Sequence, residues 1–286
     1  MIDQTLHVVA QVGILAGVFT AMLAMGAGVE FDQILESLRR PRTLLLALAA
    51  NFVAVPLFAL ALVRVLPLSV DGRTALILLG ATAGAPLLPK LAELSSGHVP
   101  FSIGLMVLLM TATVVYAPLV LPLLLPDVTV AAGDIARSLI VLLLLPLAVG
   151  LAARARYPVF AGWSTELSRI SGASMAIGLA AGLLVGWQDL LGVLGNWILI
   201  GAALLALGSL AIGWMFSFAS EPGERRVAAL GTALRNFSAA LLIAGRDFGA
   251  ETLVMTMAAT IVLMVTLVIA AGEMGRHRGV RVMGDR

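Results

Sequence analysis

Residues 84–97 read Gly84-Ala-Pro-Leu-Leu-Pro-Lys-Leu-Ala-Glu-Leu-Ser-Ser-Gly97, and they interrupt an otherwise apolar segment that covers residues 72–95. Pro86 and Pro89 each lack a backbone N–H, and each proline ring clashes with the preceding helical turn. We therefore predict that a helix over 72–95 is unwound near residues 84–89. The alternative is an ordinary proline kink, which membrane helices tolerate.

A second stretch matches the first in its position along the chain. Residues 231–245 read Gly231-Thr-Ala-Leu-Arg-Asn-Phe-Ser-Ala-Ala-Leu-Leu-Ile-Ala-Gly245, and alignment on the two leading glycines places Asn236 on Pro89. Each stretch lies in the penultimate apolar segment of its half of the chain, and the two segments run in opposite directions. Interrupted helices at matching places of an inverted repeat indicate a transport site. We predict a second unwound helix near 231–236 that crosses the first at mid-membrane.

The composition agrees with a protein that lies in a bilayer. Of 286 residues, 60% are hydrophobic and only 12% are charged, whereas about a quarter are charged in soluble domains. A membrane helix needs about 20 apolar residues, and open strands would leave unpaired backbone groups in lipid. We therefore predict an all-α polytopic membrane protein with nine transmembrane helices, over residues 7–28, 43–66, 72–95, 99–125, 132–153, 167–187, 191–218, 227–246 and 252–272.

The chain is expected to form a single transmembrane transporter domain over residues 1–286. Its first half (1–130) lacks one helix relative to its second half (131–275), and a cytoplasmic tail covers 276–286. The start of the chain has no basic region or cleavage site, so we interpret the first apolar run as a retained helix.

Arginine placement predicts the orientation, because cytoplasmic connections carry an excess of basic residues. One set of connections carries Arg39, Arg40, Arg42, Arg154, Arg156, Arg225, Arg226, Arg276, Arg278, Arg281 and Arg286. The opposite set carries Arg64, Arg73, Arg137 and Arg246. The N-terminus is therefore expected outside and the C-terminus in the cytoplasm.

Several ionisable or polar residues fall inside the predicted spans. A charge at the bilayer centre costs at least ~2.5–3.5 kcal/mol, so it needs a partner, a water-filled cavity or a function. Lys90 can pair with Glu93 three residues on, whereas Arg235 has no carboxylate three or four residues away. A buried carboxamide such as Asn51 must also find partners, either as a link between helices or as part of a site.

The sequence argues against enzymatic function. It has no cysteine, no His-Glu-x-x-His motif, no pair of aspartates within the spans and no P-loop. Three scattered histidines are too few for a metal cluster. A secondary transporter is therefore favoured over a membrane-embedded enzyme, and over a channel or a non-transporting sensor.

At these residues the chain resembles the bile acid:sodium symporter superfamily over nearly its whole length. The similar pieces are Met25–Glu30 leading to Arg39–Arg42, Asn51–Pro56, Gly80–Pro89, Gly97 to Ser102, Pro118 with Pro122, and Leu234–Ser238. The resemblance implies a panel domain and a core domain, with two unwound helices crossing in the core. It also implies sodium behind the crossing and an organic anion in front of it, in a cavity between the domains.

On that resemblance, the residues that would bind sodium have changed in this chain. A Ser-Asn pair becomes Leu88-Pro89, a Glu becomes Gly231, a Gln becomes Arg235 and a threonine ligand becomes Met106, and none of these provides a side-chain oxygen. Two fixed cations, Lys90 and Arg235, are expected beside the crossing instead. A tethered cation can neutralise the C-terminal ends of half-helices, as a metal ion would.

We therefore expect a secondary active transporter of a small organic anion that works by alternating access in a bacterial inner membrane. It is expected to be sodium-independent or proton-coupled and to need no cofactor or nucleic acid. The alternatives are a sodium-coupled symporter with backbone ligands and a non-transporting sensor or channel. The candidate substrate- and ion-binding residues are Asn51, Pro86, Pro89, Lys90, Glu93, Ser102, Thr232, Arg235, Asn236 and Ser238.

Overall fold

A computed structural model describes residues 2–125, 132–185 and 197–284, and within these ranges every regular element is a helix. The elements are α1 (Ile2–Gly28), α2 (Phe31–Leu38), α3 (Pro41–Ala49), η1 (Ala50–Ala54), α4 (Val55–Val65), α5 (Val70–Ala81), α6 (Leu88–Leu94), α7 (Val99–Leu124), α8 (Ala132–Leu139), η2 (Ile140–Leu144), α9 (Leu145–Arg156), η3 (Pro158–Gly162), α10 (Trp163–Val185), α12 (Ile198–Phe216), α13 (Pro222–Ala233), α14 (Phe237–Asp247) and α15 (Ala250–Gly284).

Six helices of the described chain are long and apolar enough to cross a membrane. They cover Val8–Gly28, Pro41–Val65, Val99–Leu124, Ala132–Arg156, Ile198–Phe216 and Ala250–Arg276. The chain is therefore an integral membrane protein with several spans. The expected third, sixth and eighth spans are absent from this set. The sixth corresponds to α10, which is one continuous helix, whereas the third and the eighth are each broken into two short helices. The third is broken into α5 and α6, and the eighth into α13 and α14.

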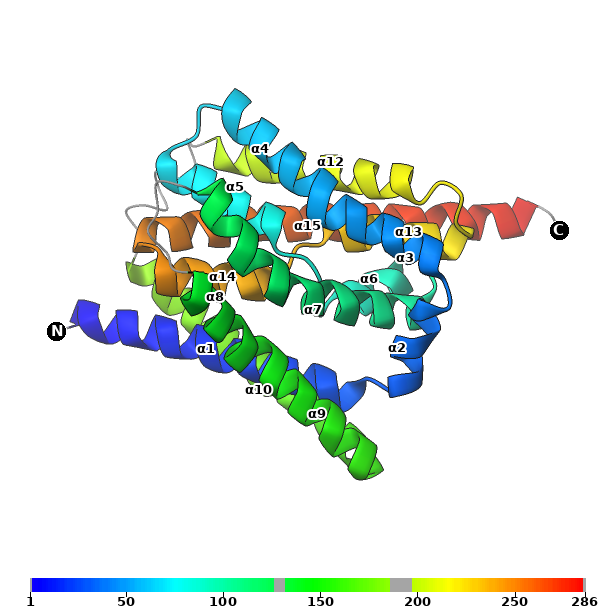
Figure 1. Cartoon of the computed structure of the whole chain (residues 1–286), viewed down its shortest axis with the longest axis horizontal. Helices are drawn as coiled ribbons and strands as arrows, with labels where there is room; N and C mark the ends of the chain where they lie inside the picture. The colour runs from blue at the N-terminus through cyan, green and yellow to red at the C-terminus, as the bar shows by residue number, and fades with distance from the viewer. Residues whose placement is uncertain (1, 126–131, 186–196, 285–286) are drawn as a thin grey trace.

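Three helices, α1, α9 and α10, pack together along one side of the molecule (Figure 1). Their seams depend on glycine. A Cβ on Gly13 would lie 2.6 Å from the Cα of Gly178, and a Cβ on Gly26 would lie 2.2 Å from the carbonyl oxygen of Leu147. Small residues at these places let the backbones approach closely, as in other membrane helix pairs.

The remaining long helices form a second group around the broken ones. Within it α12 contacts α13, α15 and α4, and α15 contacts α5. The short α2 joins α1 to α3 and packs against α7, where Gly104 lies close to Ser37. Figure 1 shows α4 and α12 on the side opposite α1, α9 and α10.

Two of the long helices contain a π-helical turn just before a proline. In η1, which precedes Pro56, the backbone N–H of Val55 donates to the carbonyl of Ala50, and η2 precedes Pro146 in the same way. A proline has no N–H for the normal helical bond, and a wider turn accommodates the loss. The turn in η1 carries Asn51 into the protein interior.

Candidate functional site

The breaks in the two interrupted helices lie against each other inside the protein. Residues 82–87 separate α5 from α6, and residues 234–236 separate α13 from α14. Ala83 and Arg235 form an isolated antiparallel bridge, and the Asn236 N–H donates to the Thr82 carbonyl at 3.1 Å. The backbones at the two breaks therefore partly satisfy each other, as helices interrupted within a membrane require.

The first break lies two residues earlier than the sequence indicates. Unwinding was expected over 84–89, but α6 begins at Leu88, so Pro89 lies in its first turn and not in the break. Proline is tolerated there because the first N–H groups of a helix have no intrahelical partner. Pro86 does lie in the break, and it is partly buried.

Gly84 and Thr113 hold the first break in place against α7. Gly84 has φ +82°, and a Cβ there would lie 2.3 Å from the backbone nitrogen of Met110. The Thr113 hydroxyl accepts from the Ala83 N–H and donates to the Ala83 carbonyl, both at 2.9 Å. The Thr113 side chain thus satisfies both backbone polar groups of Ala83, which forms the bridge with Arg235.

Arg235 lies at the junction of the two breaks and is fully buried. Its Nε donates to the Leu79 carbonyl at 2.9 Å, and its Nη2 donates to the Gly80 carbonyl at 2.8 Å. Its Nη1 donates to the Thr232 carbonyl and to Asn51 Oδ1, both at 2.8 Å. Among the described residues no carboxylate bonds this guanidinium. The positive charge instead meets carbonyls at the C-terminal ends of α5 and α13, where the helix dipole is negative.

Asn51 and Thr232 complete this carbonyl cage. Asn51 is buried, and its Nδ2 donates to the Ala47 carbonyl at 2.9 Å and to Thr232 Oγ1 at 3.2 Å. The Thr232 hydroxyl in turn donates to the Ala228 carbonyl at 2.8 Å. Asn51 therefore links η1 to α13 and also accepts from Arg235, as a link between helices requires, and its part in a binding site stays a prediction.

The space around Gly231 is filled by apolar side chains. A Cβ at Gly231 would lie 3.0 Å from Leu88 Cδ2 and 3.2 Å from Leu105 Cδ2. Met106, which follows Leu105 in α7, is also buried. The Ser102 hydroxyl donates to the Val99 carbonyl of its own helix at 2.6 Å. Sodium prefers several hard oxygen ligands. Gly231, Leu88, Leu105 and Met106 offer no side-chain oxygen to such an ion, and the cage oxygens accept hydrogen bonds from Arg235.

Asn236 and Ser238 lie at the start of α14 and are both buried. The Asn236 side chain caps this helix, since its Oδ1 accepts from the Ala239 N–H at 3.0 Å. Its Nδ2 is buried without a hydrogen-bond partner in the described part of the protein. Asn236 therefore lies at the end of the second break and caps the helix that follows it.

Lys90 and Glu93 lie on α6, directly after the first break. The Lys90 ammonium lies 3.2 Å from Glu93, but the two side chains are 78% and 55% exposed on α6. Neither belongs to the contacts that join the breaks. Lys90 forms a local pair with Glu93, three residues apart on one helix face, and its role beside the crossing stays a prediction.

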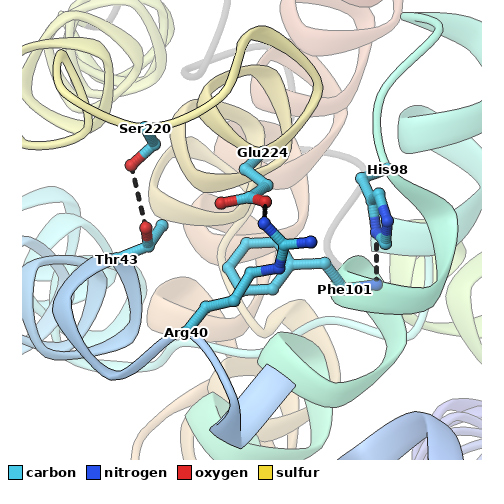
Figure 2. Close-up of polar contacts among 6 residues, drawn as sticks. All are labelled: Arg40, Thr43, His98, Phe101, Ser220 and Glu224. Atoms are coloured by element: carbon cyan, nitrogen blue, oxygen red, sulfur yellow. Dashed lines mark hydrogen bonds and ion pairs between the residues drawn. The ribbon is translucent and has the colours of Figure 1, made fainter. Parts of the chain in front are cut away.

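A separate cluster fixes the far end of α13, as Figure 2 shows. Arg40, between α2 and α3, forms an ion pair with Glu224 in the first turn of α13, and the Glu224 side chain is only 5% exposed. Thr43 and Ser220 share a hydrogen bond of 2.9 Å. His98 Nδ1 accepts from the Phe101 N–H and caps α7. This cluster ties the α2–α3 junction to α13 at the end away from the breaks.

Sequence reasoning missed Thr113 and the Leu79 and Gly80 carbonyls. Threonines in membrane helices commonly bond a carbonyl of their own helix, and Thr111, Thr256 and Thr266 do so. Nothing near Thr113 in the sequence distinguishes it from these, since its partner lies 30 residues away. The carbonyls carry no sequence signal at all.

The fold and the site define a helical membrane protein in which two discontinuous helices are joined at their breaks. The model of the Sodium Bile acid symporter family matches residues 15–186, more than half of the chain. The chain belongs to this family. The family is one of transporters and not of enzymes, in agreement with the interpretation of the sequence.

One curated relative is a "Probable sodium/metabolite cotransporter BASS2, chloroplastic" from Oryza sativa subsp. japonica. It is 26% identical to this chain over 261 residues, which cover 90% of this chain and 62% of the relative. The chain therefore spans less than two thirds of that relative's length.

Proposed function

We propose that this protein is a secondary transporter that moves a small organic anion across the membrane by alternating access. The observation that carries the proposal is the bridge between two broken helices, from Ala83 to Arg235. Discontinuous helices that meet inside a membrane protein form binding sites in many secondary transporters. Family membership and the name of the rice relative, a cotransporter of a metabolite, support the same function.

The proposal includes nine spans and an inverted repeat. We count the six long helices, the two broken pairs and α10 as nine crossings, with the breaks in the third and eighth of them. In Figure 1, the start of α3, the end of α9 and the start of α13 are at the same end as the C-terminus, and these are the arginine-rich connections. We place this end in the cytoplasm and the N-terminus outside, in a bacterial inner membrane.

Arg235 supports transport without sodium. Its guanidinium occupies a cage of three backbone carbonyls and one amide oxygen, which are the hard oxygens that a sodium ion would require. A covalently attached cation cannot leave this cage with the substrate, so it provides the positive charge without an ion gradient. A coupling proton on Lys90 has no support, because this side chain is mostly exposed and paired only at the surface.

The anionic nature of the substrate does not follow from Arg235 or Lys90. Arg235 is fully buried and bonded within the protein, and Lys90 is paired with Glu93. It is supported by the family description, since a bile acid is an organic anion.

Uptake into proteoliposomes tests the proposal. A panel of organic acids would be offered while sodium and pH gradients are varied independently. We expect accumulation of at least one acid at a rate that changes less than about twofold when potassium replaces sodium. Lys90→Gln should leave the pH profile of that uptake unchanged.

Three other results have defined meanings. Uptake that requires a sodium gradient would favour a sodium symporter that uses backbone ligands. A pH profile lost in Lys90→Gln would restore the proton-coupling hypothesis. If no acid enters while the purified protein is correctly folded, a sensor or channel would replace the transporter proposal.

A further inference from the structure

The short helix α2 carries apolar side chains on a face that the protein leaves uncovered. Phe31, Leu35 and Leu38 are spaced by four and three residues, so they share one face of the helix, and they are 67%, 40% and 46% exposed. The other face is packed, since Ser37 is fully buried and lies close to Gly104 of α7. An exposed apolar face of this kind indicates contact with a partner or with lipid.

The position of α2 in the molecule indicates that this environment is lipid. Figure 1 shows that α2 runs across the ends of the long helices instead of along them, at the end of the molecule where α9 also ends. It lies between two membrane-spanning helices, of which the first ends at Gly28 and the second begins at Pro41. An amphipathic helix at the membrane surface places its apolar face against the acyl chains.

A cavity of about 350 Å³ adjoins the uncovered face. It lies between the α1–α2 junction and the last turns of α9, and Phe31 belongs both to the cavity and to the uncovered face of α2. Three charged side chains line it, those of Glu30, Asp32 and Arg154, and apolar side chains such as Leu151 form the rest of its wall. A lipid headgroup can therefore enter the cavity while its chains follow α2.

The charges of the cavity define which headgroup fits. Arg154 Nη2 donates to Glu30 at 2.6 Å, and a guanidinium has five N–H donors, so Arg154 retains donors for a phosphate. The Glu30 side chain is 58% exposed, and Asp32 is also exposed. Two carboxylates accept hydrogen bonds from an ammonium, but they repel a headgroup that is only negative. The site therefore suits a phosphate with a primary ammonium beside it.

We propose that α2 and this cavity bind phosphatidylethanolamine. Its phosphate accepts from Arg154, its ammonium donates to Glu30 and Asp32, and its acyl chains lie along the uncovered face of α2. The quaternary ammonium of phosphatidylcholine has no N–H donor, and phosphatidylglycerol has no cation, so neither satisfies all three charged side chains. This inference requires only a protein that spans a membrane, so it does not rest on the proposed transport.

Native mass spectrometry of the detergent-purified full chain tests the proposal, because it separates the protein with no lipid from the protein with one bound lipid. The probes are the three phospholipids with identical dioleoyl chains. We expect the first phosphatidylethanolamine to bind about fivefold more tightly than phosphatidylcholine or phosphatidylglycerol, since only this headgroup makes charge-assisted hydrogen bonds to all three side chains.

Asp32→Asn tests the headgroup without removing the pair of Arg154 with Glu30. It should reduce the preference for phosphatidylethanolamine over phosphatidylcholine to less than about twofold and should raise the affinity for phosphatidylglycerol, a change of selectivity that a folding defect would not produce. Leu35→Ser should weaken the binding of all three lipids equally. Arg64 is exposed on α4 and does not line the cavity, so Arg64→Gln should bind as the wild type does.

Three results would overturn the assignment. These are equal affinity for phosphatidylethanolamine and phosphatidylcholine, tighter binding of phosphatidylglycerol, and an unchanged preference in Asp32→Asn. Arg154→Gln should weaken all three lipids, because each contains a phosphate. If Arg154→Gln does not fold, Asp32→Asn and Leu35→Ser still test the headgroup and the acyl chains separately.

Discussion

Arg235 is a buried cation that is neutralised by dipoles instead of by a carboxylate. Burying a charge is costly unless hydrogen bonds replace its hydration. Arg235 donates four hydrogen bonds to acceptors in three different elements, η1, α5 and α13. Removing the guanidinium would therefore leave several buried acceptors unsatisfied. The residue therefore holds the junction of the broken helices together, in addition to its proposed part in coupling.

Replacing Arg235 by alanine should destabilise the protein and stop transport. We expect a loss of about 3–5 kcal/mol, the range for breaking a buried charged network. Because the cage is defined by carbonyls that remain, millimolar guanidinium should restore part of the thermal stability. Thermal unfolding in detergent, with and without guanidinium chloride, measures both effects.

Arg64→Ala provides the matched control for this experiment. Arg64 is exposed on α4, so its loss should change stability by less than about 0.5 kcal/mol and guanidinium should not help it. If guanidinium destabilises both variants equally, the carbonyls do not form a cation cage.

At the scale of the elements, the broken helices depend on contacts from a neighbouring intact helix. The extended segment after α5 is too short to satisfy its own backbone, so α7 supplies the missing partner through Thr113. The close approach of Gly84 to the backbone of α7 makes this contact possible. The break is thus a property of α5, α6 and α7 together.

Thr113→Val should therefore destabilise the protein although the two side chains have nearly the same shape. The substitution leaves the buried Ala83 N–H without its acceptor, which costs about 1–3 kcal/mol. Thermal unfolding and the rate of uptake should both decrease.

Thr256→Val is the control for Thr113→Val. Thr256 is equally buried, but its hydroxyl bonds only the Thr252 carbonyl of its own helix. Loss of the Thr256 hydroxyl should reduce the stability much less, because the Thr252 carbonyl can still accept the backbone hydrogen bond of its own helix. Equal destabilisation by the two substitutions would show that Thr113 has no special role at the break.

At the scale of the whole molecule, the basic connections gather at one end of the helices. The cluster of Arg40 with Glu224 lies in these connections, so some of the arginines from which we predict the orientation also tie helices together (Figure 2). Arg154 similarly bonds Glu30 at 2.6 Å, between α9 and the α1–α2 junction. The same side chains therefore serve topology and packing.

Reporter fusions should place positions near Arg40, Arg156 and Arg226 in the cytoplasm. Fusions near Asp71, Asp127 and Gln188 should report the outside, because arginine-rich connections stay in the cytoplasm. Positions 127 and 188 lie outside the described residues. A cytoplasmic report at Gln188 would contradict both the nine-span count and the inverted repeat.

The class of fold, the approximate places of the breaks and the importance of Arg235 could be predicted from the sequence alone. An apolar run long enough to span a bilayer must be helical, and closely spaced prolines within it prevent a continuous helix. These are local constraints, so they are readable from the chain. Arg235 could also be identified, because a cation in an apolar segment is conspicuous without any knowledge of its partners.

The contacts of each polar residue could not be predicted in this way, because they depend on how the helices pack. The tertiary structure showed that Arg235 bonds backbone carbonyls, that Lys90 is exposed, that Thr113 supports the break and that Arg154 lines a cavity. Backbone carbonyls are the same at every position of a sequence. Which of them lack partners, and which side chain reaches them, depends on how distant helices pack.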